Sequence, residues 1–130
     1  MWKGKRKYGE TKTFEAGRWF DSKAEAALYH RLSIEERGGR IRDLKCQPGT
    51  VFLGPSRTQY RPDFSFVSPE TGETEWAEFK GFETPAWRIK LKLWRMVGPG
   101  KLHIWKGSAR HLTLKETVVP RGGICPTCGK

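Results

Sequence analysis

Two short segments near the middle of the chain carry residue types that could bind a divalent cation against a phosphodiester. The first reads Arg61-Pro62-Asp63-Phe64-Ser65-Phe66, and the second reads Glu78-Phe79-Lys80. Between them lies Ser68-Pro69-Glu70-Thr71-Gly72, a turn sequence, so the two segments are expected to pair as a β-hairpin. Such a hairpin would set one acid opposite a second acid and a lysine.

Side chains alternate between the two faces of a strand, which predicts what each segment exposes. The first strand has an apolar set that we expect to face the core: Tyr60, Pro62, Phe64 and Phe66. The second strand has a smaller apolar set: Ala77 and Phe79. If both sets are buried together, Asp63, Glu78 and Lys80 converge on one face. The alternative is a surface pair of Glu78 and Lys80 on a solvent-facing strand, which would contribute little.

These three residues have defined uses in phosphodiester hydrolysis. Mg²⁺ takes oxygen ligands in an octahedral shell and keeps several waters. Such ions orient a water and neutralise the charge that develops in the transition state. A lysine beside the attacking water can lower its pKa or stabilise the scissile phosphate. The carboxylates of Asp63 and Glu78 are therefore expected to carry the metal, and Lys80 to act on the nucleophile.

The remaining pattern predicts the elements that hold this hairpin. A helix is expected from a capping box of Ser22 and Glu25 to Gly38-Gly39, and a second helix over residues 84–97 with Thr84 as its cap. The order of helices and strands predicts an α/β domain with a mixed central sheet flanked by helices. The other expected elements are a short hairpin at 11–20 and strands at 44–47, 50–53, 59–67, 74–80, 102–105 and 112–114.

Composition limits the partners and the compartment. The chain of 130 residues has 25 Lys and Arg against 14 Asp and Glu, a formal charge of +11. This excess, together with six Trp, seven Phe and three Tyr, favours nucleic acid as the partner. There is no apolar run that could span a bilayer and no signal peptide, so no membrane partner is expected. An odd count of three cysteines favours reduced thiols and a cytoplasmic location, in a bacterium or a phage-infected cell.

Basic residues gather in two regions where they could contact phosphates. Residues 1–10 are expected to form a basic arm ahead of a folded domain at 11–115, and no Asp or Glu occurs from Thr84 to Lys115. In the second helix, three basic residues share a narrow sector, while the other faces are apolar enough to predict a mostly buried helix. The alternative for this sector is an ordinary solvated face. The candidate contacts to DNA are Lys3, Lys5, Arg6, Lys7, Arg61, Arg88, Lys92 and Arg95.

The motif Pro62-Asp63 followed by Glu78-Phe79-Lys80 resembles the two half-motifs of the PD-(D/E)xK nuclease superfamily. Phe20-Asp21-Ser22-Lys23-Ala24-Glu25-Ala26 looks like the first core helix of its compact members, and the resemblance spans residues 20–97. It implies a restriction-endonuclease-like core, Mg²⁺ or Mn²⁺ as cofactor, Glu25, Asp63 and Glu78 as metal ligands, and Lys80 as the catalytic lysine. It also makes the main-chain carbonyl of Phe79 a further ligand.

Two residues have competing interpretations. Glu25 could complete the capping box or reach inward to the acidic cluster, and the resemblance favours the second role. Lys90 falls opposite the basic sector of its helix, among apolar neighbours. It either extends out along its aliphatic stem or reaches the acidic cluster, where it would be an accessory residue.

The tail at 116–130 ends in Cys125-Pro126-Thr127-Cys128-Gly129, half of a zinc knuckle. Tetrahedral Zn²⁺ needs four ligands, so the missing pair would come from a second subunit or from Cys46 with a histidine. A terminal tail with free thiols is the alternative.

The resemblance extends to small phage-encoded nucleases, including endonuclease I-type junction resolvases. It therefore implies a metal-dependent DNA endonuclease acting on branched DNA, most directly a Holliday-junction resolvase. Two symmetric cuts in a four-way junction imply a homodimer. The alternatives are a nicking or transposon-end endonuclease of the same fold, or a non-catalytic DNA-binding module.

Overall fold

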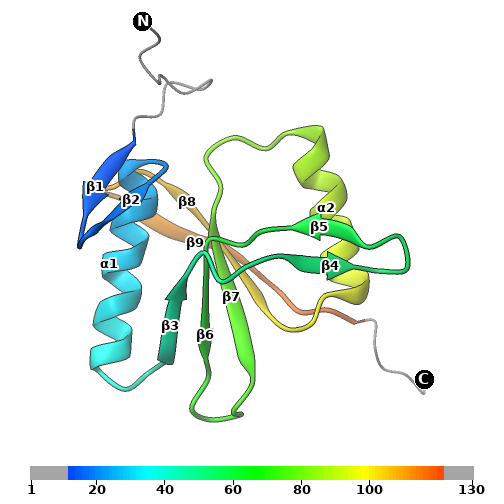
Figure 1. The fold of residues 1–130 in the computed structure, drawn as a ribbon, viewed down its shortest axis with the longest axis horizontal. Helices are drawn as coiled ribbons and strands as arrows, with labels where there is room; N and C mark the ends of the chain where they lie inside the picture. The colour runs from blue at the N-terminus through cyan, green and yellow to red at the C-terminus, as the bar shows by residue number, and fades with distance from the viewer. Residues whose placement is uncertain (1–11, 122–130) are drawn as a thin grey trace, which may run out of the picture.

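The computed structural model describes residues 12–121, which fold around a mixed five-stranded sheet with the strand order β3-β6-β7-β8-β9 (Figure 1). The expected α/β class, with a mixed sheet and flanking helices, is confirmed, and it is consistent with a restriction-endonuclease-like core. The elements are β1 (Thr13–Glu15), β2 (Arg18–Phe20), α1 (Lys23–Arg37), β3 (Arg42–Cys46), β4 (Val51–Leu53), β5 (Thr58–Tyr60), β6 (Phe64–Val67), β7 (Thr74–Phe79), α2 (Pro85–Val97), β8 (Leu102–Gly107) and β9 (Leu112–Val118).

The pairing of the strands explains why the sheet is mixed. β3, β6 and β7 are antiparallel neighbours, and β8 and β9 are also antiparallel. β7 and β8 are parallel, and α2 is the crossover that connects them. Two small antiparallel hairpins, β1-β2 and β4-β5, lie outside the main sheet.

Both helices begin as the sequence predicts. Ser22 caps α1, and its side-chain oxygen accepts the main-chain N–H of Glu25 at 3.1 Å. Thr84 caps α2 in the same way by accepting the N–H of Trp87 at 3.0 Å, and Pro85 follows at the first helical position. These caps fix where each helix starts relative to the strand or loop before it.

The sheet separates two apolar cores. α1 covers one face, and its apolar stripe packs with strand residues of the central hairpin, including Phe64, Phe66 and Ala77. α2 and the β4-β5 hairpin cover the other face, where Trp87 and Trp94 pack against β8 and β9 (Figure 1). Because both faces are covered there, the polar side chains of Ser65 in β6 and Glu78 in β7 are withdrawn from solvent.

The single strand expected over residues 59–67 is interrupted, and this part of the prediction was wrong. β5 ends at Tyr60 and pairs with β4, whereas β6 begins at Phe64 and pairs with β3 and β7. Pro62 lies between the two strands, at a position where no hydrogen bond from a main-chain N–H to a neighbouring strand is needed. As a result Tyr60 packs into the α2-side core while Phe64 packs into the α1-side core, so the two do not share a face.

Helix α2 is also less buried than predicted. Only Trp87 and Trp94 are buried, while Ile89 is 61% exposed and Met96 is 48% exposed. The sequence pattern overestimated burial because α2 packs on one side only, against β4 and the end of the sheet. Within the described part of the chain, neither helix has the length and apolar character needed to cross a bilayer.

The last strand runs further than expected. β9 continues to Val118, three residues into the region assigned to the tail, and Val118 is almost fully buried. Its pairing with Leu102 closes the edge of the α2-side core. The cysteine pair of the predicted zinc knuckle and the basic arm at 1–10 lie outside the described residues.

Candidate active site

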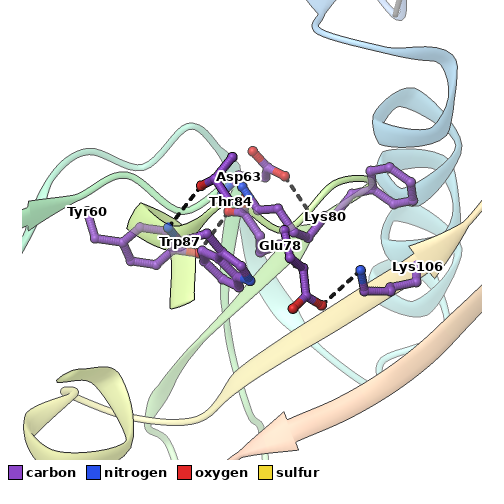
Figure 2. A network of polar contacts seen from close by, with 9 residues as sticks. Tyr60, Asp63, Glu78, Lys80, Thr84, Trp87 and Lys106 are labelled. Carbon is purple, nitrogen blue, oxygen red and sulfur yellow. Dashed lines mark hydrogen bonds and ion pairs between the residues drawn. The ribbon is translucent and has the colours of Figure 1, made fainter. Parts of the chain in front are cut away.

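The predicted acid–acid–lysine cluster forms at one end of the central hairpin, where β6 begins and β7 ends. Phe64 pairs with Ala77 across the two antiparallel strands, so Asp63 and Glu78, one step further at the same end, face each other. The break at Pro62 brings Asp63 in just ahead of β6 rather than within a continuous strand. We call Glu25, Asp63, Glu78 and Lys80 the acidic centre; Figure 2 shows Asp63, Glu78 and Lys80.

Asp63 and Glu78 are tied to one another through the main chain. The Asp63 N–H donates to Glu78 Oε1 at 3.2 Å, and the Phe79 N–H donates to Asp63 Oδ2 at 2.9 Å. The Asp63 carbonyl accepts the Gln47 N–H at 2.7 Å. These reciprocal bonds hold each carboxylate against the neighbouring strand, so their relative position is set by the backbone.

Glu78 is buried, with 5% of its surface exposed, so the alternative of a solvent-facing surface pair with Lys80 is excluded. Its Oε1 also accepts the Tyr60 hydroxyl at 2.9 Å, and its Oε2 lies 3.1 Å from Lys80 Nζ. The Lys80 ammonium in turn lies 4.6 Å from the centre of the Trp87 ring. Lys80 is therefore positioned between a carboxylate and an aromatic face at the start of α2 (Figure 2).

Glu25 lies where the cap of α1 adjoins the acidic centre. Its main-chain N–H is bound by the Ser22 cap, and its side chain is buried in the first turn of α1. The carboxylate is close enough to Asp63 for its charge to raise the pKa of Asp63. Glu25 thus approaches the acidic centre from the helix, and its role as a metal ligand stays a prediction.

Burial makes both strand carboxyls weaker acids, and repulsion from neighbouring carboxylates adds to the effect at Asp63. Burial raises the pKa of Asp63 well above its usual range, and the charges of Glu78 and Glu25 raise it further. Burial also raises the pKa of Glu78, although the Lys80 charge and the Tyr60 hydrogen bond act in the opposite direction. Several carboxyls share this centre with one close ammonium group, so ionising all of them costs free energy.

The acidic centre opens onto three adjoining hollows. One of about 500 Å³ is lined by Asp63, and one of about 360 Å³ is lined by Glu78 and Lys80. Arg61 lines both of them. The third, also about 360 Å³, is lined by Glu25 and shares Asp21 and Gln47 with the first.

The residues of the acidic centre fit a hard divalent cation in their chemistry. Mg²⁺ and Mn²⁺ prefer carboxylate oxygens, and a cation would offset the repulsion that raises the pKa of Asp63. Within residues 12–121, no three His, Cys, Asp or Glu side chains already stand together as a cation site. The carboxylates of Asp63 and Glu78 instead accept hydrogen bonds from the protein. The role of the Phe79 carbonyl stays a prediction.

Two of the three residues in the predicted basic sector of α2 lie near acids of the same chain. Arg95 forms an ion pair with Glu116 of β9 at 2.5 Å, and Arg88 lies 3.9 Å from Glu83. Lys92 is exposed. The sequence block without acids from Thr84 to Lys115 is therefore bordered by two acids, Glu83 and Glu116, that fold back onto it. The basic sector of α2 is therefore less strongly positive than its sequence suggested.

Other expected residues line the hollows. Arg61 is exposed and lies on the rim, where its Nε donates to Thr50 Oγ1 at 3.2 Å. Lys90 lines the hollow of Glu78 and Lys80, and its accessory role stays a prediction. Sequence reasoning missed Tyr60, which it assigned to the core alone. The sequence separation of Tyr60 and Glu78 did not predict their hydrogen bond, because the two residues belong to different sheets.

Cys46, named above as a possible zinc ligand, is a free cysteine, and its zinc role stays a prediction. It lies at the end of β3 near Arg18, and burial raises the pKa of its thiol. The charges of the Glu25 and Asp63 carboxylates raise the pKa of this thiol further.

The comparisons with known proteins place the chain in a family without assigning it an activity. Residues 5–113 match the family described as "Protein of unknown function (DUF1064)". The match covers most of the chain, and the chain therefore belongs to this family. A comparison with curated proteins finds none that matches.

Proposed function

We propose that this DUF1064 chain is a metal-dependent DNA endonuclease that hydrolyses phosphodiester bonds at the acidic centre. The observation that carries the proposal is the pair of half-buried Asp63 and buried Glu78, each hydrogen-bonded to the other's strand, with Lys80 Nζ 3.1 Å from Glu78 Oε2. Buried acids with raised pKa values beside a lysine, at the edge of hollows, are typical of a catalytic centre.

The residues divide the work as follows. Asp63 and Glu78, with Glu25 from α1, would hold a divalent cation through carboxylate oxygens. A bound Mg²⁺ or Mn²⁺ would supply an activated water and neutralise charge on the phosphoryl group. Tyr60 keeps Glu78 oriented through its 2.9 Å hydrogen bond.

Lys80 acts on the substrate side of the centre. Its ammonium group has three donors, and one faces Glu78 Oε2. Because Lys80 also lines the hollow beside Glu78, its other donors can reach a phosphate oxygen or the attacking water there. It would stabilise the negative charge that develops on the phosphate. Arg61 and Lys90, on the walls of the hollows, add positive charge for the flanking backbone.

We propose branched DNA as the substrate, cut by a homodimer, and the resemblance to junction resolvases is what supports this finer assignment. A labelled four-way junction, a flap, a linear duplex and a single strand should be incubated with the full chain in Mg²⁺, Mn²⁺ or EDTA. We expect cleavage with either metal, loss of cleavage in EDTA, and preference for the junction. Equal rates on junction and linear duplex would contradict the resolvase assignment while leaving the nuclease assignment standing.

The site itself is tested by three substitutions. Asp63→Asn, Glu78→Gln and Lys80→Met should each lower the cleavage rate by roughly 10²- to 10³-fold, as removal of a preorganised electrostatic group does. Matched controls are Glu70→Gln and Lys101→Met, at exposed positions away from the acidic centre. An Asp63→Asn protein that cuts at the wild-type rate would overturn the assignment of the centre.

A further inference from the structure

Three basic side chains from three different elements converge on Glu83, beside the acidic centre. Lys106 Nζ lies 2.9 Å and Lys115 Nζ 2.8 Å from the same oxygen, Glu83 Oε2. Arg88 Nε lies 3.9 Å from Glu83 Oε1. One carboxylate cannot neutralise three cations, so the cluster keeps a net positive charge. We call Glu83, Arg88, Lys106 and Lys115 the Glu83 cluster.

A β-bulge aims Lys115 at this cluster. Ile104 pairs with Glu116 and Trp105 pairs with Leu114, so Lys115 is the extra residue between the two pairs. The bulge reverses the alternation of β9, because Leu112 packs on the α1-side core while Val118 belongs to the α2-side core. Lys115 therefore reaches the α2 side next to Glu116, and a regular strand would have turned it to the other face.

The Glu83 cluster adjoins the acidic centre through the backbone. The Lys80 N–H donates to the Trp105 carbonyl at 3.0 Å, and Lys106 is the next residue of β8. Glu83 immediately precedes Thr84, which lines the hollow of Glu78 and Lys80. An extended polyanion bound over the acidic centre would pass this cluster.

The cations of the cluster retain capacity for a further anion. An ammonium group has three donors, and Lys106 and Lys115 each direct one at Glu83. The Lys115 side chain is 47% exposed and that of Arg88 is 68% exposed, so both are accessible from solvent. Glu83 orients the two lysines toward one point and offsets their mutual repulsion, as preorganisation of an anion site requires.

We propose that the Glu83 cluster is a second phosphate-binding site, which takes a backbone phosphate of the DNA duplex next to the one cleaved. The inference rests on the proposed function, because it assumes that DNA is the partner. The DNA contacts predicted from the sequence lie in the N-terminal arm, at Arg61 and in α2, and they include neither Lys106 nor Lys115. The bulge in β9 and the segment between β7 and α2, which carries Glu83, place Lys106 and Lys115 beside the acidic centre.

The test is the salt dependence of duplex binding by the full chain in EDTA, where no cleavage occurs. Each phosphate contact contributes about −0.9 to the slope of log Kobs against log salt. We expect Lys106→Gln and Lys115→Gln each to reduce the slope by about one and to weaken binding on the order of tenfold at 0.1 M salt. Lys101→Gln, at the opposite end of β8, should change neither quantity.

Several outcomes would overturn the inference. Wild-type slopes and affinities in both variants would do so, provided that thermal melts show both to be folded. Binding that requires a 5′-phosphate end, compared on duplexes with 5′-phosphate and 5′-hydroxyl ends, would assign the cluster to a terminal phosphate instead. Cleavage by the wild-type chain in Mg²⁺ is measured separately. A chain that cuts but binds independently of both lysines would refute this inference alone, and one that shows the lysine dependence but never cuts would refute the proposed function alone.

Discussion

The Tyr60 hydroxyl donates a 2.9 Å hydrogen bond to Glu78 Oε1, the same oxygen that accepts the Asp63 N–H at 3.2 Å. Tyr60 belongs to the β4-β5 hairpin and Glu78 to the main sheet, so this bond joins two sheets at the acidic centre. Both side chains are buried, and a buried carboxylate without its donor would lose a charge-assisted hydrogen bond. The position of Glu78 therefore depends on a residue with no place in the nuclease motif.

Tyr60→Phe should shift the pH dependence of cleavage. The Tyr60 hydrogen bond lowers the pKa of Glu78, so its loss raises that pKa above the already raised value. A smaller fraction of Glu78 is then ionised at a given pH, and the acid limb of the rate profile moves to higher pH. Rates measured across the acid-to-neutral range test this. Tyr29→Phe, in the α1-side core, is the control, and an unmoved acid limb in Tyr60→Phe would argue against the positioning role.

Asp63→Asn should make the protein more stable at neutral pH. Burial raises the folded-state pKa of Asp63 well above the value of the unfolded chain. Between those two pKa values the folded state binds more protons, so the free energy of unfolding falls as pH rises. An amide stays uncharged at every pH, so the variant avoids the cost of a buried negative charge. Its oxygen can still accept the Phe79 N–H. The variant should melt at a higher temperature than wild type at neutral pH, with the difference shrinking as pH falls toward 4. A lower melting temperature at neutral pH would contradict the pKa argument.

Divalent cations should stabilise the folded chain through the acidic centre. A ligand at 100 times its dissociation constant adds about 2.7 kcal/mol to the free energy of unfolding. Mg²⁺ or Mn²⁺ should therefore raise the melting temperature of the wild-type chain in a concentration-dependent way. Glu78→Gln should abolish the shift, and Glu70→Gln should preserve it. An equal shift in Glu78→Gln would place the cation elsewhere.

Glu83→Gln should lower stability at neutral pH but not in strong acid. The pKa of Glu83 falls from 4.5 to about 2, chiefly because Lys115 and Lys106 donate hydrogen bonds to it. A depressed pKa stabilises the folded state above 4.5, and the contribution is lost as pH falls through about 2. Urea unfolding of wild type and Glu83→Gln should therefore converge at low pH. A constant difference across the range would point to a loss unrelated to the charge.

The local elements were largely predictable because their signals are local. The caps at Ser22 and Thr84 bind the residues three positions on, as their spacing predicted. The turn at Ala16-Gly17 and the hairpin of β6 and β7 also follow from neighbouring residues. The break at Pro62 was missed, because which sheet a strand joins depends on partners far along the chain.

The sequence by itself determined the residue types of the acidic centre and the convergence of Asp63, Glu78 and Lys80. Alternation and a turn are enough for that, since both are properties of consecutive residues. Only the tertiary structure decided that Glu78 is buried, because burial requires α2 and the β4-β5 hairpin to cover its face of the sheet. It also decided which cations of the segment Thr84 to Lys115 are paired. Glu83 forms ion pairs with Lys106 and Lys115, and Glu116 forms one with Arg95. Long-range pairing and the bulge at Lys115 bring those charges together, and no local pattern encodes either.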